Sequence, residues 1–334
     1  MRKIVYVGNN LPAKNPTTLV QLSALLGESG FNVTIYSTKK NKLLRLFAMC
    51  NGVLKHRNAD YLLIDTYSTT NFLYALIVSQ LARLLSIKYI PILHGGNLPI
   101  RLQQNPWLSR LIFVNSYVNV APSKYLLNKF KKRNFNTVFI PNVIAIEKYA
   151  FEERVKLQPK VLWVRAFDKI YNPLMAIKVL ILLKLKYPKA KLCMVGPDKD
   201  GSMEQAKELA EQKGVLDSVE FTGILTKKAW ITKAEEFDIF INTTTVDNIP
   251  VSVIEAMALG LPVVSTNVGG MPYLITDSVD GILVESNNAV MMKGEIIKLL
   301  KNVDKVKKIT ENARKEAEKF DAVFVKQQWI NLLK

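Results

Sequence analysis

The chain has 334 residues, of which 49% are hydrophobic, and its formal net charge is +18. This length allows two domains with separate cores, and the hydrophobic share excludes an intrinsically disordered chain. The sequence shows neither an uncharged apolar run of about 18 residues nor a signal peptide, so we expect a cytoplasmic protein without a membrane span. Its two cysteines and two histidines have no metal-ligand spacing, so we expect free thiols and no metal site.

The positive charge is concentrated in the first half of the chain. Residues 1–146 contain 18 Lys or Arg and three acidic residues, which gives this half a net charge of +15. A basic surface of this kind suits an anionic lipid, an acidic glycan or a nucleic acid. Because the sequence has no helix-turn-helix, zinc or RNP pattern, we do not expect nucleic acid as the partner, although nucleic-acid binding stays open as an alternative function.

Strands and helices alternate in the first half. Strands are predicted over residues 3–8, 31–36, 61–65 and 87–93, and helices over residues 17–27 and 71–85. This alternation favours a parallel sheet with helices on both faces. The loop after the first strand contains Gly8 and Asn9 but lacks the GxGxxG pattern, so a dinucleotide site in this half is poorly supported.

The segment 39–57 combines apolar residues at helical spacing with basic residues. The apolar stripe consists of Leu43, Leu46, Phe47, Cys50, Val53 and Leu54, and the basic residues around it are Lys42, Arg45 and Lys55. Such a helix can lie on an anionic membrane, or its stripe can pack on the sheet, and the pattern fits both. A second basic cluster over residues 129–133 favours a membrane-facing half.

His94 begins a His-Gly-Gly-Asn loop at the carboxyl end of the strand predicted over residues 87–93. Open α/β sheets bind ligands at this end of their strands, and glycines allow a ligand to approach the backbone. A histidine in a loop can equally have a structural or capping role, so this position alone leaves both roles open.

The second half shows the same alternation. Strands are predicted over residues 160–164, 191–196, 219–223, 237–242 and 262–265, and helices over residues 173–186, 202–213, 250–259, 295–302 and 312–333. Arg165 and Lys169 lie on the loop that leaves the first of these strands. Two cations there can neutralise a diphosphate, and a solvated surface charge is the alternative.

The stretch from Asp247 to Thr266 is suited to an anionic ligand. Asn248 is a candidate N-cap, and the unused amides of Val251 and Ser252 would point out of the positive end of the helix, where a phosphate can bind. Glu255 lies three residues after Ser252 and leans back toward the same helix end, so its carboxylate can accept hydrogen bonds from sugar hydroxyls. A solvated glutamate is the alternative.

This stretch resembles a family signature. Asp247 and Glu255 are separated by seven residues that include Pro250, and Glu-Ala-Met-Ala-Leu-Gly-Leu-Pro-Val-Val and then Gly269-Gly270 follow. The pattern is similar to the nucleotide-sugar signature of the retaining glycosyltransferases of family four, in which the first acid is usually Glu. The resemblance implies an α/β protein of GT-B fold, with two Rossmann-like parallel-sheet domains facing a cleft.

The resemblance also implies a division of the chain and a set of site residues. Residues 1–146, with a C-terminal helix at about 315–334 that crosses back, would bind the acceptor, and residues 147–314 would bind the nucleotide sugar. The implied donor-binding residues are Arg165, Lys169, Gly223, Ile224, Asn248, Val251, Ser252 and Glu255. The implied catalytic residues are His94, Asp247 and Arg165, and the implied cleft-loop residues are Gly8 and Asn9.

The resemblance implies that the protein transfers a hexose-type sugar from a nucleoside diphosphate sugar to an acceptor hydroxyl, with retention of the anomeric configuration. We expect UDP rather than GDP or ADP as the nucleotide, no metal or other cofactor, and a lipid-linked or glycan acceptor in cell-surface polysaccharide or glycolipid synthesis. The protein would be cytoplasmic or peripheral on the inner face of the cell membrane, with its basic first domain on anionic lipid. A nucleotide-sugar epimerase of the same fold stays open as an alternative enzyme.

Overall fold

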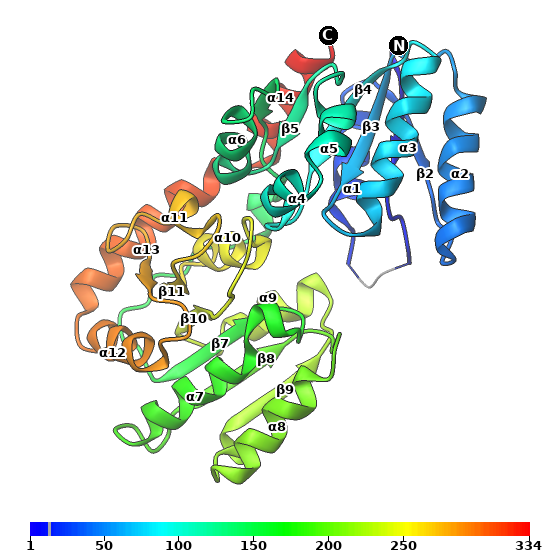
Figure 1. The fold of residues 1–334 in the computed structure, drawn as a ribbon. Coiled ribbons are helices and arrows are strands. Elements are labelled where there is room, and N and C mark those ends of the chain that lie inside the picture. The colour runs from blue at the N-terminus through cyan, green and yellow to red at the C-terminus, as the bar shows by residue number, and fades with distance from the viewer. Residues whose placement is uncertain (13–14) are drawn as a thin grey trace. The chain divides into compact units, whose positions relative to one another are not determined.

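The computed structural model describes residues 1–12 and 15–334, which divide into two compact α/β units (Figure 1). The first unit comprises Met1–Val143 together with Phe320–Lys334, and the second comprises Ile144–Lys319. The sequence-based boundaries at residue 146 and near residue 315 lie a few residues from these limits. Each unit contains a six-stranded parallel sheet.

The sheet of the first unit is buried between two layers of helices. Its strands are β1 (Lys3–Val7), β2 (Asn32–Tyr36), β3 (Tyr61–Thr66), β4 (Lys88–Leu93), β5 (Asn119–Ala121) and β6 (Thr137–Phe139). They are adjacent in the order β2-β1-β3-β4-β5-β6. Because helices cover both faces, β3 is buried along its whole length, as its Tyr-Leu-Leu-Ile run predicts.

The helices of the first unit divide between the two faces of this sheet. They are α1 (Thr18–Glu28), α2 (Lys42–Lys55), α3 (Thr70–Leu84), α4 (Leu98–Gln104), α5 (Pro106–Phe113), α6 (Lys124–Lys131) and α14 (Ala322–Leu333). The core on one face takes Val5 and Val7 of β1 with side chains of α2 to α6. The core on the other face takes Ile4 and Tyr6 with side chains of α1 and α14.

Helix α14 brings the end of the chain into the first unit (Figure 1). Its residues Val325, Trp329 and Leu333 are buried in the core on the α1 face. The single terminal helix predicted over residues 312–333 is wrong. The chain leaves the helical conformation at Asp321, whose carboxylate caps α14 by accepting a hydrogen bond from the amide of Val323 at 2.9 Å.

Helix α2 divides the predicted apolar stripe between the core and the surface. Val53 is buried, whereas Leu43 is 78% exposed, Phe47 is 70% exposed and Leu54 is also exposed. Arg45, which we had counted among the surrounding basic residues, is buried. Its guanidinium donates to the backbone carbonyls of Lys39 and Lys40, so it fixes the start of the helix instead of extending the basic surface.

The sheet of the second unit consists of β7 (Lys160–Val164), β8 (Lys191–Val195), β9 (Val219–Gly223), β10 (Ile239–Asn242), β11 (Val263–Thr266) and β12 (Ile282–Val284). These strands are adjacent in the order β12-β11-β10-β7-β8-β9. The helices are α7 (Pro173–Lys184), α8 (Ser202–Gln212), α9 (Lys227–Ala234), α10 (Val251–Ala258), α11 (Met271–Leu274), α12 (Ala289–Leu300) and α13 (Val303–Glu318). Short 3-10 turns occur at Ile146–Lys148, Lys169–Tyr171 and Leu216–Ser218.

The predicted start of α7 agrees with the structure. The Asn172 side chain accepts a hydrogen bond from the amide of Met175 at 3.3 Å, and Pro173 occupies the first turn, where its missing N–H costs nothing. Across the described ranges 1–12 and 15–334, no helix is both long enough and apolar enough to span a bilayer.

Candidate functional site

The predicted donor residues lie around the topological switch point of the second sheet. The chain leaves β7 toward β8 on one side and later returns as β10 on the other side of β7. Loops on the two sides of such a switch point diverge and leave room for a ligand at the carboxyl ends of the strands. Arg165 follows β7 directly, and Asp247 lies on the loop that follows β10.

Arg165 and Asp247 form an ion pair that joins these two loops. The guanidinium also lies over the ring of Tyr171, with its central carbon 3.9 Å from the ring centroid. Burial raises the pKa of Asp247 above its ordinary value, and the charge of Arg165 opposes this shift. The Nε atom of Arg165 is buried and has no hydrogen-bond partner among the described residues, so this donor is unused.

Helix α10 begins later than we predicted. Pro250, not Asn248, is the N-cap, and no side-chain hydrogen bond caps the helix. The backbone of Pro250 is extended, with φ −70° and ψ 125°, so Val251 is the first helical residue. No acceptor is found for the amides of Val251 and Ser252 among the residues that the structure describes, and the hydroxyl oxygen of Ser252 is buried without a partner there.

Glu255 is 3% exposed, so the alternative of a solvated glutamate is wrong. The hydroxyl of Tyr149 donates to its Oε1 at 2.7 Å, and the ammonium of Lys227 pairs with the same oxygen. Burial raises the pKa of Glu255, and the charge and hydrogen bond of Lys227 and then the hydrogen bond of Tyr149 oppose this shift. The carboxylate is therefore held in place by two donors on one oxygen, Oε1.

The position of Tyr149 is fixed from α13. The guanidinium of Arg314 donates to the carbonyl of Tyr149 at 2.6 Å and to the carbonyl of Ala258, the last residue of α10, at 2.8 Å. One side chain thus ties the Tyr149 segment to the helix that carries Glu255.

Gly269 and Gly270 are required by the close approach of two backbones. A Cβ added to Gly270 would lie 1.6 Å from the carbonyl oxygen of Asn248, and one added to Gly269 would lie 2.0 Å from that of Asp247. Gly269 also has a φ of +55°, which favours glycine. The segment 269–270 therefore packs directly against the loop that carries Asp247 and Asn248.

The other predicted donor residues lie on separate loops of the second unit. Gly223 ends β9 with a φ of +65°, and its carbonyl accepts a hydrogen bond from Gly196 at 2.9 Å. Ile224 follows it and is 43% exposed. Lys169 lies on a 3-10 turn, where its amide donates to Asp200 and its side chain is exposed, and no described contact joins it to Arg165.

The predicted residues of the first unit also lie at the carboxyl ends of their strands. Gly8 follows β1, and its amide donates to the carbonyl of Tyr36 at 2.7 Å. The side chain of Asn9 accepts from Arg45 at 3.0 Å and donates to Asn71 at 3.3 Å. His94 follows β4 and is buried, with its Nε2 3.0 Å from the carboxylate of Asp65.

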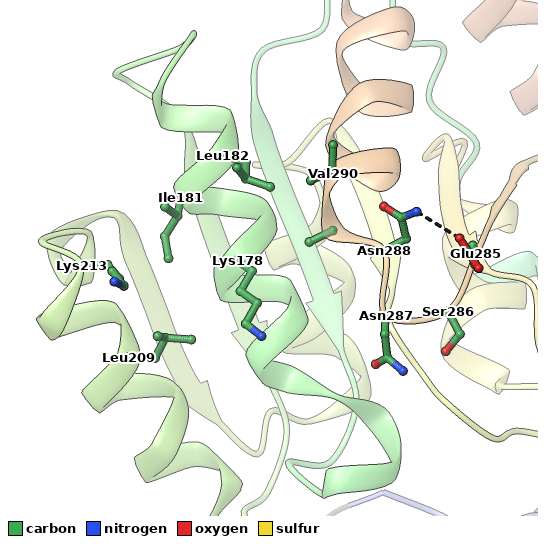
Figure 2. Close-up of a pocket in the computed structure, with 11 residues that line it drawn as sticks. Lys178, Ile181, Leu182, Leu209, Lys213, Glu285, Ser286, Asn287, Asn288 and Val290 are labelled. Atoms are coloured by element: carbon green, nitrogen blue, oxygen red, sulfur yellow. Dashed lines mark hydrogen bonds between the residues drawn. The ribbon is translucent and has the colours of Figure 1, made fainter.

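A hollow of about 640 Å³ lies elsewhere in the second unit, and Figure 2 shows its lining. It is bounded by α7, α8 and the loop before α12, with Ile181, Leu182, Leu209 and Val290 as its apolar part. It contains none of the predicted donor residues. The polar pair drawn there, Asn288 and Glu285, is already satisfied by a hydrogen bond of 3.1 Å. We therefore place the candidate site at the switch point, where buried donors are unused.

The sequence analysis did not identify Tyr149 and Lys227 as partners of Glu255. Tyr149 lies 106 positions before Glu255 and Lys227 lies 28 positions before it, so no local spacing connects them. Asp65 was predicted only as the end of a strand, because its contact with His94 spans 29 positions.

The family model described as Glycosyl transferases group 1 matches residues 146–316. The chain is 26% identical over 213 residues to a Haemophilus influenzae protein named an uncharacterized glycosyltransferase, a match that covers 61% of this chain and 56% of that protein. It is 28% identical over 165 residues to the poly(glycerol-phosphate) alpha-glucosyltransferase of Bacillus subtilis, which covers 47% of this chain and 23% of that protein. The matches therefore span about half or less of these relatives.

Solved structures resemble the whole chain. Sucrose-phosphate synthase from Thermosynechococcus elongatus has a TM-score of 0.82 at 15% identity, with 99% of this chain and 98% of that chain covered. HepE of Anabaena in complex with UDP-glucose has a TM-score of 0.78 at 17% identity, with 100% and 99% covered. The predicted α/β fold of GT-B type is confirmed by these likenesses and by the two parallel sheets.

We expect Glu255→Gln to change the pH dependence of stability in a defined direction. A carboxyl group whose pKa is raised by folding stabilises the protein below its ordinary pKa of 4.5 and loses this contribution as the pH rises through the raised value. The unfolding free energy of the wild type relative to Glu255→Gln should thus fall as the pH rises above about 4.5. Urea denaturation at several pH values measures this difference, with the exposed Glu208→Gln as control. If the difference in unfolding free energy between the wild type and Glu255→Gln stays constant or grows with pH, it would contradict a raised pKa for Glu255.

We expect Gly270→Ala to destabilise the second unit by about 1–3 kcal/mol or more, since the added methyl group overlaps a backbone carbonyl that cannot move independently. Gly27→Ala is the control, because a Cβ there meets no atom within 4 Å. It should be neutral or stabilising by up to about 1 kcal/mol, as expected for alanine in a helix. Equal unfolding free energies for the two variants would contradict the close approach.

Proposed function

The chain belongs to the family Glycosyl transferases group 1, and we propose that it transfers a sugar from a nucleoside diphosphate sugar to an acceptor hydroxyl with retention of configuration. The observation that carries this proposal is the set of unused donors at the switch point of the second sheet. They are the Nε of Arg165, the hydroxyl of Ser252 and the amides of Val251 and Ser252.

In this proposal the donor diphosphate binds at the start of α10. The amides of Val251 and Ser252 form the positive end of the helix, and the forked guanidinium of Arg165 turns from Asp247 toward the phosphates. Lys169, whose side chain is exposed, and the polar loop at Asn248 complete this half of the donor site. Arg165 is suited to this role because the planar fork of a guanidinium matches the geometry of a phosphate as well as that of a carboxylate.

The nucleoside contacts the remaining donor-binding residues. Glu255 accepts hydrogen bonds from the ribose hydroxyls through the oxygen that Tyr149 and Lys227 do not use. The backbone of Gly223 and Ile224 reads the base. We propose UDP ahead of GDP or ADP, and the support for it is that HepE of Anabaena, a relative in fold, was solved with UDP and with UDP-glucose.

The chemistry is electrostatic. As the bond between the sugar and the diphosphate breaks, negative charge develops on the leaving phosphate, and preorganised donors in a buried site stabilise it. Arg165 and the α10 amides supply this stabilisation, so the proposed reaction requires neither a metal ion nor another cofactor. The leaving phosphate accepts the proton of the acceptor hydroxyl on the same face of the sugar. We assign Asp247 to the hydroxyls of the transferred sugar, and His94 of the first unit to a sugar hydroxyl of the substrate.

We place the reaction in the synthesis of a cell-surface polysaccharide or glycolipid, with a lipid-linked or glycan acceptor bound by the first unit near Gly8 and Asn9. Two relatives support this class of product by their names, the poly(glycerol-phosphate) alpha-glucosyltransferase of Bacillus subtilis and the putative colanic acid biosynthesis glycosyltransferase WcaL of Salmonella typhimurium. Neither name describes an epimerase or a nucleic-acid-binding protein.

The exposed face of α2 supports contact with an anionic membrane from the cytoplasmic side. Leu43, Leu44, Phe47 and Leu54 are exposed there, and Lys40, Lys42 and Lys55 are exposed beside them. Apolar side chains would enter the lipid interface while the ammonium groups remain at the headgroups, each basic residue contributing about 1 kcal/mol near an anionic surface.

We expect Arg165→Ala to lower the rate at which the enzyme releases UDP from its best UDP-sugar by about two to three orders of magnitude. Loss of one preorganised donor to developing charge typically costs about 2.7–4 kcal/mol. The thermal stabilisation of the wild type by UDP should also shrink in this variant. Lys199→Ala, which removes an exposed cation from the same unit, is the control. Wild-type turnover by Arg165→Ala would contradict the proposed phosphate role.

We expect the double variant Leu43→Ser and Phe47→Ser to bind vesicles of mixed phosphatidylcholine and phosphatidylglycerol at least about a hundredfold more weakly, since each side chain contributes about 1.5–3 kcal/mol when fully buried. Co-sedimentation at low and high salt measures this binding. Leu185→Ser is the control, because Leu185 is similarly exposed but lies in the second unit. Unchanged co-sedimentation of the double variant, or none by the wild type, would exclude α2 as a membrane contact.

A further inference from the structure

Asp65 is the buried acid of a strongly basic half. Residues 1–146 contain only Glu28, Asp60 and Asp65 as acids, and the first two are exposed, whereas Asp65 is 6% exposed. It lies in β3, which is otherwise apolar up to Ile64. A buried carboxylate is costly unless donors satisfy it, so the contacts that it makes indicate its role.

Two donors from the neighbouring strands meet at one oxygen of this carboxylate. The hydroxyl of Tyr6 on β1 donates to Oδ1 at 2.7 Å, and Nε2 of His94 lies 3.0 Å from the same oxygen. Parallel pairing places β3 between β1 and β4 and so brings Asp65 between these side chains. Burial and the adjacent charge of Asp65 raise the pKa of Tyr6, so its hydroxyl keeps its proton and remains a donor.

Gly8 leaves the space that the carboxylate occupies. A Cβ added at Gly8 would lie 2.6 Å from Oδ2 of Asp65 and 2.4 Å from a methyl carbon of Leu19. A larger residue at this position would therefore crowd both the carboxylate of Asp65 and the side chain of Leu19.

His94 is held on three sides. Its amide donates to the carbonyl of Thr66 at 2.8 Å, its ring stacks on Tyr67 with centroids 4.9 Å apart and planes inclined by 23°, and its Nε2 faces Asp65. A carboxylate only accepts hydrogen bonds, so Nε2 carries the proton. Nδ1 is then the ring nitrogen left to accept a hydrogen bond from a ligand.

We propose that Asp65 is a positioning residue for sugar transfer, which fixes the ring of His94 through Nε2 so that Nδ1 accepts a hydrogen bond from a sugar hydroxyl of the substrate. The hydroxyl of Tyr6 holds the Asp65 carboxylate in the orientation that His94 requires, and Gly8 leaves space for it. The inference rests on the proposed function through the role of His94, but the pairing itself belongs to the first unit alone. For metal-bound histidines, partners that orient the ring through its second nitrogen typically contribute about 10- to 100-fold to metal affinity or activity, and we expect the same scale for His94.

Kinetics of matched variants test this role. Asp65→Asn keeps the size of the side chain and removes its charge, and we expect the turnover number for UDP release to fall by about 10- to 100-fold. UDP binding, which depends on the second unit, should not change. Tyr6→Phe should cost less than Asp65→Asn because the carboxylate remains. Asp60→Asn removes the same charge from an exposed position in the same unit and should leave turnover unchanged.

Nuclear magnetic resonance of the histidine side chains tests the pairing itself, whereas the split between lowered turnover and unchanged UDP binding separates a positioning role from a purely structural one. The chain has only two histidines, His56 and His94, so ¹⁵N-labelled imidazoles are assigned with one His94→Gln variant. In the wild type we expect a slowly exchanging, downfield Nε2 proton on His94, as a charge-assisted hydrogen bond produces. This proton should move upfield in Asp65→Asn, where the acceptor is neutral, and disappear in Asp65→Ala.

The two hypotheses fail in different ways. An active wild type together with an equally active Asp65→Asn, or a His94 proton that the Asp65 variants leave unchanged, would overturn the positioning role and leave the proposed function intact. A wild type that neither binds UDP nor releases UDP from any UDP-sugar would overturn the proposed function, and the catalytic part of this inference would fail with it.

Discussion

The ion pair between Arg165 and Asp247 is the interaction on which the candidate donor site depends, because it joins the two loops that diverge at the switch point of the second sheet. Both side chains are largely buried, so each charge requires the other while no ligand is bound. Their mutual neutralisation keeps a guanidinium at the edge of the sheet without an excess of buried charge. When the guanidinium turns to a phosphate, Asp247 loses this partner, and in the proposed complex hydroxyls of the transferred sugar take its place.

Backbone contacts around α10 shape the same candidate site. The backbone stays extended as far as Pro250, so the first amides without acceptors are those of Val251 and Ser252. Gly269 and Gly270 allow a second segment to lie against Asp247 and Asn248 with no side chain between them. Glu255, which Tyr149 and Lys227 hold, stands one turn into the helix. The site is therefore positioned by backbone contacts and buried pairs that exist without the ligand.

The sequence predicts the fold well because apolar periodicity and turn residues are local signals, and strands such as Lys160–Val164 lie where they were predicted. The start of α10 was misplaced because Asn248 has a side chain suited to an N-cap, whereas the backbone stays extended as far as Pro250 and no side chain caps the helix. Lys227, Tyr149 and Asp65 could not be identified as partners, since their contacts arise only when distant strands and helices come together. Arg45 was misjudged for the same reason: its burial depends on two carbonyls of the preceding loop.

The central claim is that the start of α10 and the Arg165 guanidinium bind the diphosphate of an activated sugar. A crystal structure of the protein with UDP tests this claim most directly. The account predicts that phosphate oxygens accept hydrogen bonds from the amides of Val251 and Ser252 and from Arg165, and that the ribose hydroxyls donate to Glu255. A diphosphate bound elsewhere, with Arg165 still on Asp247 and the helix start unoccupied, would contradict it.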